Sequence, residues 1–225
     1  EEAYDEEQLD SYELGLKSDW LNQRLRVNAA LFYNDYQDMQ IAVFEAGSGG
    51  ASSRITNAGE STYQGLEVEV FALLSENITL DLTYGYLDAE FDEYNARNPV
   101  TNQIENIADV TTVTRAPENT GSLGLQYSLP NTGIGALSAR VDVTYTDSMT
   151  FNQFDTADSR TVANARLTLD ELSVGNGGEL RLSAWVKNFT DEEYREWGID
   201  FGTLGFAGNV WNQPRTFGFD AIYRF

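Results

Sequence analysis

Carboxylates are the residues of this sequence with the greatest capacity for chemistry, and four of them crowd the stretch "DAEFDEY". They are Asp88, Glu90, Asp92 and Glu93. Hard cations take oxygen ligands, so these side chains form a candidate calcium or cationic-ligand site. Their spacing does not match an EF-hand loop, and an acidic run is ordinarily a solvated loop face. Both interpretations stay open, and we assign no metal ligand from the sequence.

The sequence has few of the residue types that other kinds of catalysis use. The chain has no histidine and no cysteine, which removes the Ser-His-Asp triad, the commonest general base, thiolate chemistry and disulfides. The Gly-x-Gly of "GIGALS" (133–138) follows a turn and opens a strand, so it is not a dinucleotide fingerprint. Glycosidase-like carboxylate pairs are expected by chance among 36 acidic residues. We predict no catalytic residue, no bound cofactor and therefore no enzyme.

Composition bounds the class of protein. The 225 residues suffice for one large all-β domain or for a piece of something larger. A net charge of −22 argues against a nucleic-acid partner, which needs a basic surface. No run approaches the ~18 apolar residues of a membrane-spanning helix, although the alternating strands of a membrane barrel also leave hydropathy low. Residue 1 is Glu and no signal peptide is visible, so we expect a processed N-terminus or a fragment.

Alternation of apolar and polar residues is the dominant pattern along the chain. Between 77 and 92, for example, Leu80, Leu82 and Tyr84 alternate with Asp81 and Thr83. A period of two indicates strands with one apolar and one wet face. We predict about nine strands, at 11–20, 24–43, 60–74, 77–92, 114–129, 136–149, 160–171, 179–190 and 214–225. A short tenth strand is a further candidate within "REWGIDFGTLGF".

The connections between these strands alternate between short and long. The short ones are rich in Asn, Gly and Ser, as hairpin turns are; they lie at 21–23, 75–77, 130–135 and 173–178. The long ones lie at 44–59, 93–113, 150–159 and 191–213. An outer-membrane barrel has short periplasmic turns and long extracellular loops, whereas a soluble sandwich has no reason to sort its loops in this way. The pattern therefore favours an antiparallel transmembrane β-barrel segment.

The final strand closes the chain on aromatic residues. In "RTFGFDAIYRF" one face carries Phe217, Phe219, Ala221 and Tyr223, and Phe225 is the last residue. In water such an edge strand invites aggregation. Lipid against the aromatic face and a partner on each edge remove that hazard in a closed barrel.

The two faces of the strands have different expected surroundings. Aromatic residues near strand ends are predicted to form interfacial girdles, namely Trp20, Tyr33, Tyr84, Tyr86, Tyr127, Tyr145, Tyr223 and Phe225. The polar residues predicted to face the barrel interior are Glu67, Glu69, Asp81, Arg140, Asp142, Arg166, Arg181, Lys187 and Arg224. In the simpler interpretation, these polar residues form ladders of paired side chains on the water-facing side of the barrel wall. In the other, they contact a plug or a passing substrate.

Four stretches that together span nearly the whole chain read "SYELGLKSDWLNQRLRVNAALFYNDYQDMQI", "NAGESTYQGLEVEV", "VKNFTDEEYREWG" and "QPRTFGFDAIYRF". In this order they resemble the C-terminal part of the barrel of TonB-dependent receptors of Gram-negative outer membranes. The first resembles the strand–turn–strand unit of that family, the second its "NAG...GxE" strand, and the third its "NLFDxxY" segment, with Phe189 and Thr190 at the Leu-Phe pair. The fourth is similar to the closing "PRTxGxxxxYRF" strand.

The resemblance implies that residues 1–225 are the C-terminal portion of a barrel of about 22 strands, which at about 25 residues per strand needs roughly 550 residues. The plug domain, the TonB box and the signal peptide that precede such a barrel are not among these residues. An odd strand count also departs from the even number of a complete bacterial barrel, so this chain is expected to start outside, end inside and not close by itself.

Function and partners follow from the same resemblance. It implies an outer-membrane importer of a scarce nutrient, with a ferric siderophore or another metal chelate as the small-molecule substrate. Its partners are membrane lipid, the TonB complex and the barrel-insertion machinery. The terminal aromatics Phe217, Phe219, Tyr223 and Phe225 are the expected assembly signal. Candidate ligand contacts in the loops are the aromatic and arginine residues that often anchor recognition, namely Tyr94, Arg97, Arg160, Trp197 and Trp211.

Two other classes of protein remain open from the sequence. A small, complete, passive or structural barrel would need an even number of strands, so a clear tenth membrane strand would favour it. A secreted β-sandwich binding module would be soluble without detergent, but its strands would leave one broad apolar face.

Overall fold

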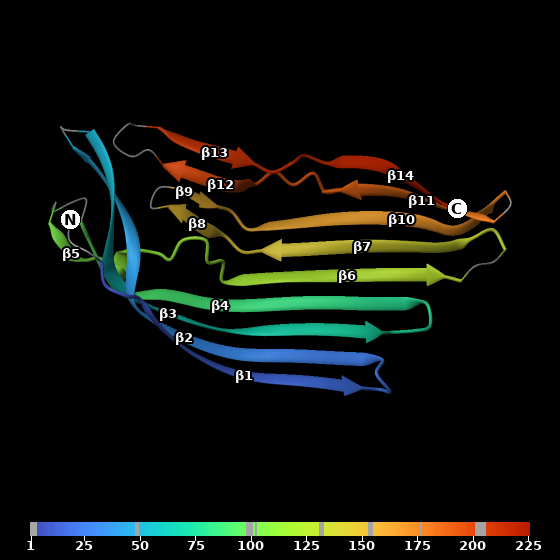
Figure 1. Cartoon of the computed structure of the whole chain (residues 1–225), viewed down its shortest axis with the longest axis horizontal. Helices are drawn as coiled ribbons and strands as arrows, with labels where there is room; N and C mark the ends of the chain where they lie inside the picture. Colours follow the sequence, from blue (N-terminus) through green and yellow to red (C-terminus); the bar gives the residue numbers. More distant parts are fainter. Residues whose placement is uncertain are drawn as a thin grey trace.

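Nine antiparallel strands, paired in chain order, form one curved sheet in the computed structural model (Figure 1). The structure describes residues 4–47, 50–97, 101, 103–130, 133–152, 155–175, 177–200 and 206–225. The strands of the sheet are β1 (Gln8–Trp20), β2 (Leu25–Gly47), β3 (Gly50–Leu73), β4 (Ile78–Arg97), β6 (Asn119–Leu129), β7 (Ala136–Thr146), β10 (Arg160–Val174), β11 (Gly178–Lys187) and β14 (Thr216–Arg224). The prediction of an antiparallel all-β wall of nine strands is confirmed.

Shorter elements lie in the long connections. The strand β5 (Ile104–Asn106) pairs with β4, and the 3-10 helix η1 (Ala108–Val110) follows it. Two small hairpins form separate sheets, one from β8 (Met149–Asn152) and β9 (Asp155–Ala157), the other from β12 (Arg195–Asp200) and β13 (Ala207–Trp211). The candidate tenth strand is therefore β12, which belongs to a loop hairpin and does not add to the wall. No helix in the described part is long and apolar enough to cross a membrane.

Several predicted boundaries were wrong, among them the end of the strand predicted at 77–92, because β4 continues to Arg97. The connection predicted at 44–59 is mostly strand, because β2 and β3 stay paired until Gly47 meets Gly50. The alternation of "IAVFEAG" continues past the predicted end, and a long hairpin keeps its backbone groups bonded. The strand predicted from 114 begins only at Asn119, after Pro117, which has no N–H to donate to a ladder.

The short connections and the C-terminus gather at one end of the sheet, and the long connections gather at the other (Figure 1). We call these the short-turn end and the long-loop end. In the β1–β2 turn, Leu21, Asn22 and Gln23 all have positive φ, at 55°, 57° and 66°. The Arg24 guanidinium then donates to the Leu73 carbonyl at 3.0 Å and ties this turn to the end of β3. The predicted sorting of the connections is confirmed.

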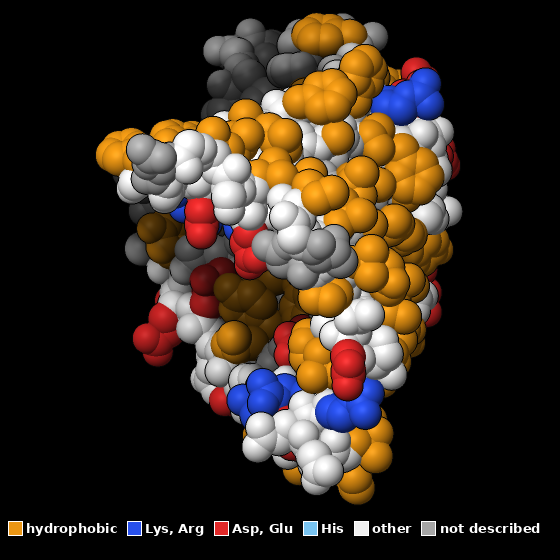
Figure 2. All heavy atoms as spheres, turned by 90° about the vertical axis from the view of Figure 1, so that its right-hand side faces the viewer, with side chains coloured by type: hydrophobic (Ala, Val, Ile, Leu, Met, Phe, Trp, Pro, Cys, Tyr) orange, Lys and Arg blue, Asp and Glu red, His pale blue; other side chains and the backbone are white. Residues whose placement is uncertain are grey.

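Most apolar residues of the strands lie on the same side of the sheet. Directly opposed residues share a face in an antiparallel pair, and one apolar row across β2, β3, β4, β6 and β7 consists of Val27, Val70, Leu82, Leu123 and Val143. In Figure 2, which looks onto the short-turn end, hydrophobic side chains gather along the outer side and charged side chains lie around the hollow. We call the two sides the apolar face and the polar face.

The apolar face has no protein layer against it among the described residues. Phe219 on this face is 82% exposed, and the buried apolar residues of the described part are few. They are Ala72, Val113, Phe151, Ala157 and Ala163. A β-sandwich would cover this face with a second sheet, so the sandwich alternative is wrong for the described part of the chain.

The sheet is an open wall. Among the described residues, β1 pairs with β2 and β14 pairs with β11, and no ladder joins β1 to β14. A barrel must close so that no strand edge is left unpaired. The fold is therefore that of a barrel portion, and the alternative of a small complete barrel is not supported.

Candidate ligand-facing surface at the long-loop end

Ion pairs cross the polar face of the wall from strand to strand. Arg140 lies between two carboxylates, with N–O distances of 2.7 Å to Asp81 and 2.6 Å to Asp142. Arg166 on β10 pairs with Asp220 on β14 at 2.9 Å. Arg181 pairs with Asp170 near the short-turn end. Because these side chains remain partly exposed, each pair adds little to stability. Together they make this face of the sheet polar, with its opposite charges paired.

The predicted paired ladder is thus confirmed for Asp81, Arg140, Asp142, Arg166 and Arg181. The remaining predicted residues have other surroundings. The Asn28 amide donates to Glu69 at 3.2 Å, and the Lys187 ammonium lies 5.5 Å from the centre of the Trp185 ring. Glu67 stands opposite Gly85, and Arg224 stands opposite Glu179.

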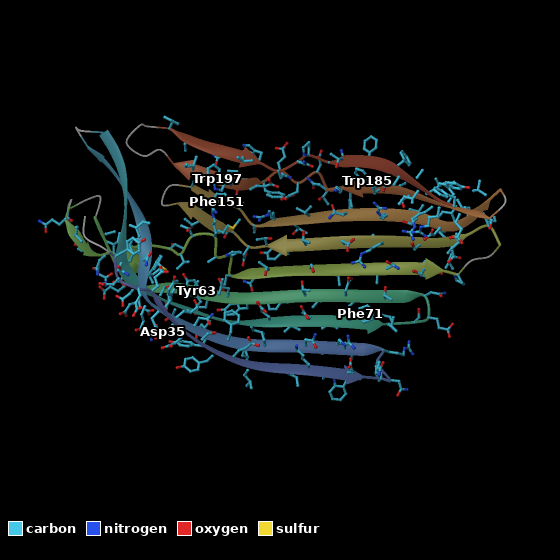
Figure 3. The ribbon with its side chains drawn as sticks, in the orientation of Figure 1. Asp35, Tyr63, Phe71, Phe151, Trp185 and Trp197 are labelled. Carbon is cyan, nitrogen blue, oxygen red and sulfur yellow. The ribbon has the colours of Figure 1, made fainter. Side chains whose placement is uncertain are left out.

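Two glycines of the strand motifs lie beneath aromatic rings. A Cβ on Gly218 would collide with the Trp185 ring, and a Cβ on Gly65 would lie 2.6 Å from Phe32. Trp185 is labelled in Figure 3 beside β11 and β14. Glycine in a strand commonly marks a close approach of this kind, which gives a physical reason for the glycines of "GLE" and "TFGF".

The two small hairpins dock against one another at the long-loop end. Asp155 on β9 is almost fully buried and forms an ion pair with Arg195 on β12. The Asp155 carboxylate also lies against Gly198, where a Cβ would collide with its Oδ2 atom. Phe151 on β8 is buried in the same region, and β8 contacts β12, the strand that carries Trp197 (Figure 3). The ion pair thus ties β9 to β12, and both strands of the β8–β9 hairpin contact β12.

Arg160 enters this region from the start of β10. Its guanidinium lies 4.7 Å from the centre of the Tyr194 ring, a cation–π distance. Two buried polar atoms, Arg160 Nη1 and Asp155 Oδ2, have no hydrogen-bond partner within the described part of the chain. A buried guanidinium N–H of this kind is a ready donor for an anionic oxygen.

Three of the five predicted ligand contacts lie on or next to the docked hairpins. Arg160, Trp197 and Trp211 belong to the region around the docked hairpins, and Trp211 stands opposite Arg195 in the β12–β13 ladder. Trp197 and Trp211 are both exposed. Tyr94 lies apart on β4 and packs on Phe91 with 4.8 Å between ring centres. The side chain of Arg97 lies outside the described residues.

Sequence reasoning missed the partners that organise this region. Asp155, Tyr194 and Arg195 lie within the acidic runs "DTADS" and "DEEYREW", whose residues are expected on a solvated face. The one available signal was a basic residue, Arg195, inside an otherwise acidic run. Asp155 and Arg195 are 40 residues apart, and their pairing depends on how two hairpins dock.

The acidic stretch lies on β4, where its carboxylates accept hydrogen bonds from nearby side chains. The Gln64 amide donates to Asp88 at 3.0 Å, and the Thr62 hydroxyl donates to Asp92 at 2.8 Å. The Asn95 amide donates to Glu93. Among the described residues, no group of three or more carboxylates is placed to hold a metal ion. These acidic residues belong to β4 and not to a loop, and three of them accept side-chain hydrogen bonds.

Replacing Asp155 by Asn is expected to weaken the docking of β8–β9 on β12 by about 1–2 kcal/mol, because Arg195 loses its anionic partner. Backbone amides of both hairpins should then exchange faster in hydrogen–deuterium exchange. Asp158→Asn is a matched control, since Asp158 follows the same hairpin and is exposed. Equal exchange in the two variants would show that the ion pair does not hold the hairpins.

A one-layer curved sheet with an uncovered apolar face and a charged, paired face defines the wall of a transmembrane β-barrel. The family model described as "TonB dependent receptor-like, beta-barrel" matches residues 3–189. The chain therefore belongs to the TonB-dependent receptor family, as part of its β-barrel domain. Members of this family are transporters and receptors of Gram-negative outer membranes.

Individual relatives agree with this assignment. The metal-pseudopaline receptor CntO of Pseudomonas aeruginosa is 28% identical over 213 residues, covering 94% of this chain and 26% of CntO. The ferric yersiniabactin uptake receptor FyuA of Yersinia pestis superposes with a TM-score of 0.73 at 22% identity, covering 97% of this chain and 30% of FyuA. For the siderophore receptor PiuA of Acinetobacter baumannii the TM-score is 0.70 at 18% identity, covering 96% of this chain and 28% of PiuA. The chain thus spans about a quarter to a third of the length of these proteins.

Proposed function

We propose that this chain is the C-terminal barrel portion of an outer-membrane importer that takes up a ferric siderophore. The observation that carries the proposal is the two-faced wall, found in a chain that belongs to the TonB-dependent receptor family. Its apolar face meets membrane lipid, and its polar face lines the passage. In this orientation the short-turn end is periplasmic and the long-loop end is extracellular.

The region around Arg160 supports the choice of a metal chelate as cargo. Arg160 offers a buried N–H without a partner in the described residues, and Trp197 and Trp211 are exposed on the β12–β13 hairpin. Arginine and tryptophan are common recognition anchors, and the oxygen ligands of ferric chelates are acceptors for a guanidinium. The relatives FyuA and PiuA are a ferric yersiniabactin receptor and a siderophore receptor.

Energy and partners belong to the same proposal. A plug domain elsewhere in the protein occupies the lumen, and the TonB complex of the inner membrane drives its movement. The ion-paired polar face should bind a moving plug only weakly. Its paired charges are solvated, and it offers no large apolar surface for the plug to pack against. We propose the polar face as the surface that meets the plug.

The importer is tested by deleting the whole gene and measuring uptake of radioactive iron from siderophores under iron limitation. We expect uptake of one siderophore to be lost and to return with the intact gene. Normal uptake of every siderophore tested would exclude the proposed cargo. Because CntO is a metal-pseudopaline receptor, the same cells are also tested with chelates of zinc, nickel and copper, and a defect with one of these instead would reassign the cargo.

The terminal aromatics are proposed to act as the assembly signal read by the barrel-insertion machinery. Phe217, Phe219, Tyr223 and Phe225 are all exposed on the apolar side or at the end of β14. Deleting Phe225 is expected to lower the amount of protein in the outer membrane severalfold, while Phe225→Tyr keeps an aromatic terminus and should assemble normally. The measurement is an immunoblot of outer-membrane fractions, and equal amounts of the two variants would contradict the role.

A further inference from the structure

The last long connection contains a break in strand pairing that side chains bridge. The β11–β14 ladder of the wall ends at Lys187, and the β12–β13 ladder of the loop hairpin begins at Arg195. The two segments between these ladders, 188–194 and 212–215, differ in length, so the backbone pairing cannot simply continue. In Figure 1, β12 and β13 nevertheless extend the line of β11 and β14. We call the two segments the stems, and together they form the joint.

Two asparagine side chains replace the missing ladder in the joint. Asn188 is buried, and its side chain accepts from the Glu192 N–H and donates to the Glu192 carbonyl oxygen, both at 2.9 Å. Asn212, on the other stem, accepts from the Tyr194 N–H at 2.9 Å and donates to the same Glu192 carbonyl oxygen at 2.9 Å. The two stems are therefore joined by amide side chains where backbone groups would otherwise pair.

An aspartate and an arginine close the joint next to the wall. Asp191 Oδ1 accepts from the Arg215 backbone N–H at 2.9 Å, and the Asp191 carboxylate lies 3.5 Å from the Arg215 guanidinium. The guanidinium also donates to the Phe189 carbonyl oxygen at 3.3 Å. Asn188 and Asp191 have positive φ, at 51° and 59°, a conformation that Asn and Asp adopt more readily than most residues. The motif stretches "NFTDEEY" and "QPRT" thus meet in one structure.

Neighbouring strands also fix the joint and the hairpin beyond it. The Asn188 N–H donates to Asn164 Oδ1 on β10 at 2.9 Å, which attaches the joint to a third strand of the wall. Farther out, the ion pair of Arg195 with Asp155 attaches the side of the β12–β13 hairpin to β9. The hairpin is therefore held both at its base and along its side.

We propose that the joint presents the β12–β13 hairpin as a preformed binding platform for the metal chelate, with Asn188, Asp191 and Asn212 as positioning residues. A lid needs a base that is free to bend, whereas this base is bonded across both stems. Trp197 and Trp211 are exposed on the hairpin, so it offers aromatic surface to the chelate without the entropic cost of ordering a loop. The inference rests on the proposed function in one respect, namely that a chelate is bound at the long-loop end.

The first test is hydrogen–deuterium exchange of the intact receptor, purified from outer membranes in detergent with no chelate added. The hydrogen-bonded amides of 195–200 and 206–211 should exchange slowly in the unmodified protein. Asn212→Ala should raise their exchange rate about tenfold, the change expected when one or two net hydrogen bonds are lost. Asn209→Ala is the matched control, because Asn209 is exposed on β13 and its side chain makes no hydrogen bond within the described part of the chain.

The second test measures uptake of iron-55 carried by the siderophores of iron-starved culture medium, in cells that express each variant from the full gene. Asn212→Ala should raise the concentration for half-maximal uptake about tenfold and leave the maximal rate per receptor unchanged. A residue with a structural role only would instead lower the amount of receptor in the outer membrane. Asp191→Asn keeps an acceptor for the Arg215 N–H and loses the charge, so it should act in the same direction by a smaller factor. It also keeps the test usable if Asn212→Ala fails to fold.

Several results would overturn the proposal. One is equal exchange in Asn212→Ala and Asn209→Ala, and another is exchange in the unmodified hairpin as fast as in an unstructured peptide, which would mean that only the chelate orders it. An unchanged half-maximal concentration in Asn212→Ala, together with faster exchange, would show that the hairpin does not bind the chelate. If the unmodified receptor takes up no siderophore iron, the proposed function fails, and exchange still decides whether the hairpin is preformed.

Discussion

Replacing Leu82 by Arg is expected to destabilise the receptor in its membrane by about 2–4 kcal/mol. Leu82 lies midway along the apolar part of β4, opposite Val70 on β3 and Leu123 on β6. A guanidinium at this depth would leave water for hydrocarbon, and no acidic side chain of the same row would neutralise it. The measurement is the free energy of unfolding by urea in phospholipid vesicles.

The matched control is the next residue along the strand. Thr83 points to the polar face, opposite Glu69 on β3 and Ser122 on β6, with its hydroxyl 2.7 Å from that of Ser122. Thr83→Arg places the same charge in a wet setting beside a carboxylate, and we expect a change within about 0.5 kcal/mol. Similar losses for both variants would mean that the apolar face does not meet lipid.

Replacing Gly65 by Val is expected to cost about 3 kcal/mol of unfolding free energy, at the upper end for forced overpacking. A Cβ at this position would collide with the Tyr86 carbonyl oxygen and lie 2.6 Å from the Phe32 ring. The ring can rotate away, but the carbonyl belongs to the β3–β4 ladder and can move only by distorting it. Truncation of Phe32 to Ala in the same chain should therefore recover only a small part of the loss.

Gly15→Val is the control for this second substitution. Gly15 lies on β1, also in one of the motif stretches, and a Cβ added there would have Glu13 Oε1 as its nearest atom, at 3.6 Å. We expect the free energy of unfolding to change by less than about 0.5 kcal/mol. If both glycine variants were equally stable, the close approach of β3 and β4 would not be the reason why position 65 is occupied by glycine.

Features with a local cause were predictable from the sequence. The alternation of Leu80, Leu82 and Tyr84 with Asp81 and Thr83 identified the two faces of β4, because successive side chains of a strand point to opposite sides. The turn residues identified the short-turn end for a similar reason. Asn, Gly and Ser adopt turn conformations that other residues resist.

Extents of strands were less predictable, because pairing overrides local signals. The bulge at Asp38, whose φ is 53°, does not end β2, since β3 continues to pair with it as far as Gly47. A bulge also falls at Asp92, where Glu60 stands opposite Glu93 and Ser61 opposite Phe91. Such an extra residue changes which side chains share a face, so Glu93 lies opposite Glu60 on the same face as Glu90, which strict alternation along the sequence would place on the other face.

The sequence by itself determined the class of wall: nine two-faced strands, short and long connections in alternation, and an aromatic final strand. Tertiary structure alone decided which charges meet, as in the pair of Arg140 with Asp81, 59 residues apart, and which loops dock, as in the pair of Asp155 with Arg195. The physical reason is that a face is encoded by a period of two within one strand. A contact between strands depends on register and hairpin docking, which no single segment specifies.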